Sequence, residues 1–188
     1  MPDVFSLEPD TRIDIRNSYI LSYPYIRNYF ASKVPFDAED LVCGAHMVYG
    51  WMPTALDLYP HTPNIDLEAG ARLLTKARLQ GSLEEKELKN LSALVNNSVV
   101  GASKLLHFVA PTSFAIWDSK IYKFLAEQAG HHYRVNDVGA YLDYLRKLET
   151  SRMDMQFPGF HKSVNRKLGY DVSGMRALEL IMFLNAPA

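Results

Sequence analysis

Apolar residues in this chain recur mainly three and four positions apart, and the strict alternation typical of strands is scarce. The clearest stripe lies in one segment and consists of Val138, Tyr141, Leu142, Leu145 and Leu148. Either Asn136 or Asp137 can cap a helix that begins there. We therefore expect an all-α protein.

Helix caps and helix breakers define further elements. An acidic or hydroxyl side chain at an N-cap satisfies a free backbone amide, whereas glycine and proline end helices. Three helices are predicted on this basis: one from Asp37 and Asp40 toward Tyr49, ended by "GWMP" at 50–53, one from Asp66 to near Gly81, and one over 174–184 after Ser173.

The middle of the chain predicts two helices joined by a tight turn. Ser82 and Glu85 have the spacing of a capping box, which predicts a helix over 83–95. Asn96, Asn97 and Ser98 favour a turn near 96–101, with Gly101 as a second flexible point. A short helix over 102–109 should follow.

A proline-containing link then separates this helix from the next one. Pro111 stops the short helix, and Asp118 can cap a new one that ends at Gly130. The residues of the new helix that should face inward are Ile121, Phe124 and Leu125.

The remainder of the chain suggests one compact unit. Beyond residue 150, the stretch "DMQFPGFHKSVNRKLGYDVSG" predicts loops around a short helix. The 188 residues suffice for a single domain, or for two small lobes that share a core. Neither an internal repeat nor a low-complexity linker is evident.

Composition and charge narrow the function classes. Hydrophobic residues make up 48% and charged residues 22%, as in ordinary globular domains. The net charge of −1 argues against a protein that coats nucleic acid or acidic membranes through bulk charge. Cys43 is the only cysteine, and neither a secretory signal nor an apolar run long enough to span a bilayer is present. We expect a cytoplasmic protein without membrane contact, metal or cofactor.

The segment "GASKLLHFVAPTSFAIWDSKIYKFL", residues 101–125, carries a family resemblance. Its order of tight turn, short helix, proline-containing link and "IWDSKI" resembles the helix-hairpin-helix DNA glycosylase superfamily, above all the compact bacterial proteins described as 8-oxoguanine DNA glycosylase-like. Residues 117–121 fit that superfamily's pattern of hydrophobic residue, Asp, Ser or Thr, any residue, and aliphatic residue. The hairpin itself, "NNSVVGASK", lacks the proline and one glycine of the family's usual Leu-Pro-Gly-x-Gly.

The resemblance implies two catalytic residues. Asp118 matches the family's catalytic aspartate, and Lys104 is the nearest match to the lysine of its bifunctional members. A fixed carboxylate stabilises the positive sugar that forms when an N-glycosidic bond breaks. A neutral lysine amine can attack the anomeric carbon and form a Schiff base. The structural alternatives are an ordinary N-cap for Asp118 and a solvent-facing lysine.

Several neighbours are candidates for binding DNA and its base. Trp117, Trp51 and Phe114 could stack on an extruded base, and His107 lies on the face of the same predicted helix as Lys104. Each of these is also a typical core residue. Gly101 and Ser103 in the hairpin, and Lys120 among the basic residues beyond it, are expected at the DNA backbone. His131 and His132 lack carboxylate neighbours, so no metal site is predicted.

Two functions from different classes fit these observations. The first is a DNA glycosylase, with or without lyase activity, that removes an oxidised or otherwise modified base from duplex DNA. The alternative is a module without catalysis that binds nucleic acid or a protein on a glycosylase-like fold, and the altered hairpin and near-neutral charge favour it. The sequence does not indicate a particular protein partner.

Overall fold

The fold is entirely helical in the residues that the structure, a computed structural model, describes: 3–52, 54–60, 64–126 and 132–187. These residues form ten α-helices and one 3-10 helix, η1. They form no strand, and Leu58 and Val95 make an isolated antiparallel bridge. The predicted all-α class is confirmed. In the described part of the chain, none of the helices combines the length and apolar character that crossing a bilayer requires.

The helices follow one another with short connections. In chain order they are α1 (Val4–Leu7), α2 (Ser18–Ala31), α3 (Ala38–Trp51), α4 (Leu67–Gln80), α5 (Glu85–Leu94), α6 (Val99–Val109), α7 (Ser119–Ala126), η1 (His132–Asn136), α8 (Val138–Arg152), α9 (Phe157–Leu168) and α10 (Gly174–Leu184).

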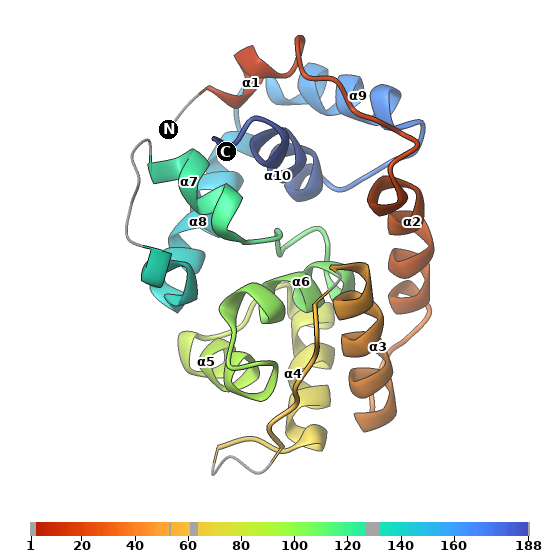
Figure 1. The fold of residues 1–188 in the computed structure, drawn as a ribbon, viewed down its shortest axis with the longest axis vertical. Helices are drawn as coiled ribbons and strands as arrows, with labels where there is room; N and C mark the ends of the chain where they lie inside the picture. The colour runs from red at the N-terminus through yellow and green to blue at the C-terminus, as the bar shows by residue number, and fades with distance from the viewer. Residues whose placement is uncertain (1–2, 53, 61–63, 127–131, 188) are drawn as a thin grey trace.

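Two groups of helices pack on each other (Figure 1). In the first, which we call the α6 group, α2, α3, α4 and α5 all contact α6. In the second, the α10 group, α1, α7, α8 and α9 all contact α10. One hydrophobic cluster contains buried side chains from both groups, such as Leu105 of α6 and Leu178 of α10. The junction between the groups is therefore part of a continuous core.

Most of the predicted caps occur as expected, because each depends only on residues three positions apart. Asp37 and Asp40 form a reciprocal capping box at the start of α3. A side-chain oxygen of the N-cap accepts a hydrogen bond from a backbone amide at the starts of α4, α8 and α10, where the caps are Asp66, Asp137 and Ser173. Gly81 ends α4 in the left-handed conformation, at φ 69°.

The predicted capping box at the start of α5 is displaced. Glu84 is the N-cap in place of Ser82, and its backbone amide donates to Oε2 of Glu87 at 2.8 Å. The other carboxylate oxygen of Glu87 pairs with Nζ of Lys76 on α4 at 2.6 Å. This tertiary contact holds Glu87 at the third position of the helix, which explains the shift of two residues.

The tight turn before α6 is shorter than predicted, and Gly101 is not part of it. Asn96 and Asn97 adopt positive φ values of 55° and 48°, and Ser98 then caps α6 at Val99 in place of residue 102. Gly101 lies buried within α6. A Cβ atom built there would lie 1.8 Å from the hydroxyl oxygen of Tyr49, so this glycine allows α3 to pack closely on α6.

Two segments contain more helix than the sequence pattern predicts. The region after residue 150 forms the full helix α9, because Phe160, Val164 and Leu168 make a buried stripe at a spacing of four. A proline near its start and the left-handed Gly169 at its end fix its bounds. The tyrosine-rich stretch "YILSYPYIRNYF" is most of α2. The predicted cap Gly130 lies outside the described residues.

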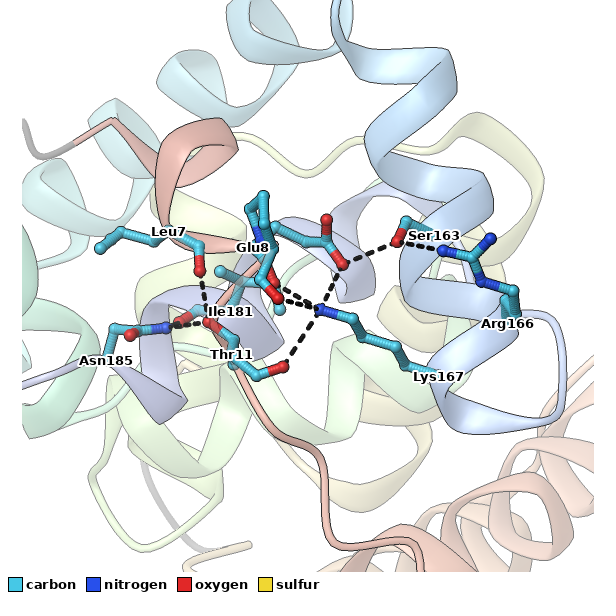
Figure 2. Close-up of polar contacts among 9 residues, drawn as sticks. Leu7, Glu8, Thr11, Ser163, Arg166, Lys167, Ile181 and Asn185 are labelled. Atoms are coloured by element: carbon cyan, nitrogen blue, oxygen red, sulfur yellow. Dashed lines mark hydrogen bonds and ion pairs between the residues drawn. The ribbon is translucent and has the colours of Figure 1, made fainter.

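The N-terminal segment is fastened to α9 and α10 by the contacts in Figure 2. Nζ of Lys167 donates to the backbone carbonyls of Glu8, Pro9 and Thr11 and pairs with the Glu8 carboxylate at 2.7 Å. Nδ2 of Asn185 donates to Oγ1 of Thr11 at 2.8 Å. We call the contacts of Lys167 the N-terminal clamp.

Replacing Lys167 with methionine is expected to lower the free energy of unfolding by about 2 kcal/mol, the usual cost of removing a charged hydrogen-bond donor from buried acceptors. Methionine keeps most of the apolar stem, so the loss reports on the ammonium group. Urea denaturation measures the change. Lys162→Met, at an exposed position of the same helix, is the control and should change stability by less than about 0.5 kcal/mol. Equal effects of the two substitutions would show that the clamp contributes nothing.

Candidate active site

Asp118 caps α7, as the sequence pattern predicts, and its position is fixed from two sides. Its Oδ1 accepts a hydrogen bond from the amide of Ile121 at 3.0 Å, which makes it the N-cap. Ser103 of α6 fastens the preceding residue, because its Oγ lies 3.1 Å from the amide nitrogen and 3.2 Å from the carbonyl oxygen of Trp117. The carboxylate is partly buried, and within the described residues no hydrogen bond reaches its Oδ2. One oxygen therefore remains available for other chemistry.

Lys104 lies on α6 and is partly buried. Burial lowers the pKa of its ammonium below the ordinary value, and the positive charge of Arg176 adds to this. The negative charges of Asp118 and Glu179 oppose the shift without cancelling it. Within the described residues, Nζ of Lys104 takes part in no hydrogen bond or ion pair. An amine of this kind loses its proton more readily than a surface lysine.

A buried ion pair on α10 lies beside these two residues. Arg176 is 1% exposed and Glu179 is fully enclosed, and Nη1 of the arginine contacts Oε2 of the glutamate one turn later. The guanidinium also lies over the rings of Tyr19 and Tyr23 from α2, at 5.2 and 4.9 Å from their centroids. These ring contacts fix the orientation of Arg176.

Three buried polar atoms around this pair lack hydrogen-bond partners in the described residues: Nη2 of Arg176, Oε1 of Glu179 and Oη of Tyr144 on α8. Buried polar groups are nearly always satisfied, because leaving one unpaired costs about 1 to 3 kcal/mol. A buried ion pair also stabilises a fold little compared with apolar residues of similar size. Core stability therefore does not explain this arrangement.

The same burial changes the protonation of the pair. Enclosure raises the pKa of Glu179 to about 7, although Arg176 acts in the opposite direction. Burial alone would lower the pKa of Arg176, but the carboxylate of Glu179 and the hydroxyls of Tyr19 and Tyr23 raise it overall, so the guanidinium stays charged. Glu179 is thus an acid that titrates near neutral pH beside a permanent cation.

These groups form one polar cluster, which consists of Lys104, Asp118, Arg176, Glu179, Tyr19 and Tyr144. The charges of Asp118 and Lys104 both act on Glu179, and those of Glu179 and Asp118 act on Tyr144. The members come from α2, α6, α8, α10 and the link before α7. The cluster therefore lies at the junction between the α6 group and the α10 group.

The two predicted tryptophan platforms differ in their surroundings. Trp117 is 2% exposed, its Nε1 donates to the carbonyl of Val135 at 2.8 Å, and its ring packs against Tyr144. It is a core residue in this structure. Trp51 is partly buried at the end of α3 and stacks on Tyr19 with the ring centroids 4.1 Å apart. Trp51 is the more accessible of the two, and its stacking partner Tyr19 belongs to the polar cluster.

His107, predicted to contact the base, packs inside the fold. It is fully buried, with Nε2 2.8 Å from the hydroxyl of Tyr23 and Nδ1 2.8 Å from the carbonyl oxygen of Phe114. Burial lowers its pKa to about 3, and the charge of Arg176 acts in the same direction. Both nitrogens are occupied, so His107 is a neutral histidine that links α2 to the residues after α6.

The three residues predicted at the DNA backbone differ in their exposure. Gly101 and Ser103 are buried within α6, so neither can contact a phosphate in this conformation. Ser103 instead positions Trp117 and Asp118. Lys120 is exposed, with its Nζ 4.5 Å from the centroid of the Phe183 ring. Lys120 alone of these three lies where it can contact DNA.

The cavities described near the polar cluster do not include its two candidate catalytic residues. Trp117 and Tyr144 line a cavity of about 230 Å³, but neither Asp118 nor Lys104 contributes to its lining. A groove of about 790 Å³ runs along α9, where Lys162 and Arg166 line it. The side chains of Asp118 and Lys104 are nevertheless partly exposed.

Sequence reasoning did not identify Arg176 and Glu179. A signal was present, because "MRALELIMFL" places an arginine and a glutamate three residues apart within an otherwise apolar helix. Charged residues on the buried face of such a helix are rare and often functional. Tyr19 and Tyr144 carried no comparable signal.

Comparison with known proteins finds no matching family model, no similar curated protein and no similar solved structure. In the part of the chain that the structure describes, no group of three or more histidine, cysteine, aspartate or glutamate side chains could hold a metal ion.

Proposed function

We propose that this protein is a DNA N-glycosylase with a lyase step, acting in the cytoplasm on duplex DNA that contains an oxidised or otherwise modified base. The observation that carries the proposal is Lys104, a partly buried lysine with a lowered pKa that lies within electrostatic reach of the helix-capping Asp118. The resemblance of residues 101–125 to helix-hairpin-helix glycosylases supports the same two residues.

Asp118 acts electrostatically in this mechanism. Positive charge builds on the sugar as the bond to the base breaks, and a carboxylate fixed nearby lowers the energy of that transition state. The N-terminus of α7 stabilises the negative charge of Asp118, and the hydrogen bond from Ile121 holds its orientation. Its second oxygen faces no competing donor among the described residues.

Lys104 acts as the nucleophile. Its neutral amine attacks C1′ of the sugar, the new C–N bond replaces the bond to the base, and loss of the sugar ring bond gives an imine. Burial favours the neutral amine, which is the reactive form. The stacked pair of Trp51 and Tyr19 is partly accessible and includes a member of the polar cluster, so it could hold the extruded base.

Borohydride trapping tests the proposed nucleophile. Wild-type protein incubated with a duplex that carries one abasic site should form a covalent adduct, and Lys104→Ala should abolish it. Lys86→Ala, an exposed lysine on α5, is the control and should trap at the wild-type level. An adduct that survives in Lys104→Ala would exclude Lys104 as the nucleophile.

Base release tests the role of Asp118. On duplexes with a panel of oxidised, alkylated and otherwise modified bases, wild-type protein should release at least one base. Asp118→Asn keeps the helix cap and removes the charge, so release should fall by about 100-fold or more, as expected when a group that stabilises transition-state charge is lost. Unchanged release in this variant would contradict the mechanism.

A binding module without catalysis is the second candidate function, and two observations favour it. Gly101 and Ser103 are buried, and the cavity beside Trp117 excludes Asp118 and Lys104. This candidate predicts salt-dependent DNA binding with neither an adduct nor base release from the full panel.

A further inference from the structure

Glu179 is a buried carboxyl group with one free oxygen, placed in the same cluster as Lys104. Arg176 holds Oε2, while Oε1 has no hydrogen-bond partner in the described residues. The proposed chemistry of Lys104 and Asp118 leaves this oxygen unused. A buried acceptor without a donor is costly, so its presence calls for a donor that arrives during the reaction.

Charged and titratable groups act on Glu179 from α10 itself and from the neighbouring elements. Within the described residues, Glu179 interacts electrostatically with Arg176 of α10, Lys104 of α6, Asp118 of the link before α7, Tyr144 of α8, and Tyr19 and Tyr23 of α2. Lys104 is the one group among them that carries a proton it must lose in order to react. Arg176 remains charged throughout.

Asp118 is less suited to accept this proton. Its Oδ1 is engaged by the amide of Ile121, and the N-terminus of α7 stabilises its negative charge. A carboxylate that must stabilise a positive sugar also has to remain ionised during the reaction. Glu179 does not have to remain ionised during the reaction.

We propose that Glu179 accepts the proton of the Lys104 ammonium and later returns it to the departing group, with Arg176 as the residue that positions the carboxylate. This inference rests on the proposed glycosylase and lyase function. The inference adds a third ionisable residue to the site. Asp118 stabilises the positive charge of the sugar, and Glu179 transfers the proton.

Each step balances. The Lys104 ammonium gives one proton to Oε1 of Glu179 and becomes a neutral amine. The amine forms a bond to C1′, the bond from C1′ to the base breaks, and the base leaves with the electron pair and takes the proton from Glu179. On an abasic site, the amine adds to the aldehyde carbon, and the same proton leaves with water as the imine forms.

Burial brings the two groups toward matched proton affinities. It raises the pKa of Glu179 to about 7 and lowers the pKa of Lys104. Proton transfer between groups of similar pKa has a small free-energy cost, and a proton acceptor that titrates near the working pH is the most effective.

The rate of borohydride trapping on a duplex with one abasic site, measured from pH 5 to 9, tests the proposal. Glu179 is ionised only above about pH 7, so the wild-type rate should rise with pH through that value. Glu179→Gln should trap about 100-fold more slowly at pH 7.5, the usual contribution of a proton-transfer group, and should lack the rise near pH 7. Glu179→Asp should recover part of the rate and the rise.

Glu8→Gln is the matched control, because Glu8 is also a buried carboxylate paired with a cation and lies at the N-terminal clamp. It should lose stability without a change in the pH profile. If Glu179→Gln does not fold, the double variant Arg176→Met/Glu179→Leu replaces the pair with apolar side chains, and it should fold and show the same loss of rate.

The outcomes separate this proposal from the one on which it rests. Wild-type protein that forms no adduct through Lys104 would overturn the glycosylase function and this inference with it. Wild-type protein that traps through Lys104, while Glu179→Gln or the folded double variant keeps the wild-type rate and pH profile, would overturn the role of Glu179 alone.

Discussion

Acidification from pH 6.5 to pH 3 should reduce the free energy of unfolding by up to about 5 kcal/mol through His107 alone. Burial lowers the pKa of this histidine from 6.5 in the unfolded chain to about 3 in the fold. Each pKa unit of difference corresponds to about 1.4 kcal/mol. The folded state favours the neutral ring, so this stabilisation is complete above pH 6.5 and is lost as the pH falls toward 3.

Urea denaturation of the wild type and of His107→Gln at several pH values tests this expectation. Glutamine cannot become charged in this range, so the stability difference between the two proteins should shrink steadily below pH 6.5. Tyr23→Phe is the control, because it removes the hydroxyl that lies 2.8 Å from Nε2 and keeps the titrating ring. It should cost about 1 kcal/mol and preserve the pH dependence. A difference between wild type and His107→Gln that does not vary with pH would contradict the prediction.

Replacing Arg176 with methionine should lower the free energy of unfolding by about 3 to 5 kcal/mol at pH 8, because it leaves the Glu179 carboxylate buried without its cation. The cost should be smaller at pH 5. Since burial already raises the pKa of Glu179 to about 7, the carboxyl group is protonated in the fold at that pH and needs no cation.

The double variant Arg176→Met/Glu179→Leu shows how much of this loss comes from leaving the Glu179 charge buried without its partner. Removing both charges should recover most of the stability lost in Arg176→Met, because an apolar pair of similar size is often as stable as a buried ion pair. Urea denaturation of the four proteins of this cycle at pH 8 measures the coupling. If the loss in the double variant equals the sum of the losses in the two single variants, the two side chains act independently.

The helix starts could be predicted because their signals are local. At Asp66, Asp137 and Ser173 the capping side chain and the amide it binds lie within three residues, so no tertiary contact is needed to recognise the cap. The predicted start of α5 was wrong because the true start depends on a tertiary contact. Lys76, eleven residues away on α4, holds Glu87 in place, and nothing in the local sequence indicates that pairing.

Burial within α6 could not be predicted, because both sides of this helix are covered by other elements. Ser103, a candidate for phosphate contact, faces the link that carries Trp117, and His107 faces Tyr23 on α2. A sequence pattern gives the spacing of residues on a helix but not the identity of the element that packs against each face. The closeness of Lys104 and Asp118, by contrast, follows from the short link between α6 and α7.

The ion pair of α10 shows what the spacing of charged residues cannot predict. Arg176 and Glu179 are spaced as an ordinary surface pair, three residues apart, and such pairs are common on exposed helices. The apolar residues around the pair in α10 indicate that it is buried. The spacing alone does not show which helices enclose it, among them α2, whose Tyr19 and Tyr23 lie against the guanidinium.

The N-terminal clamp has a consequence for synthesis on the ribosome. Lys167 lies more than 150 residues after the carbonyls that it binds, at sequence separations of 156 to 159. Residues 8–11 are therefore made long before α9 and cannot reach their place until α9 has left the exit tunnel. We expect the α6 group, whose helices are neighbours along the chain, to assemble first, and the α10 group to close over it once α9 and α10 have emerged.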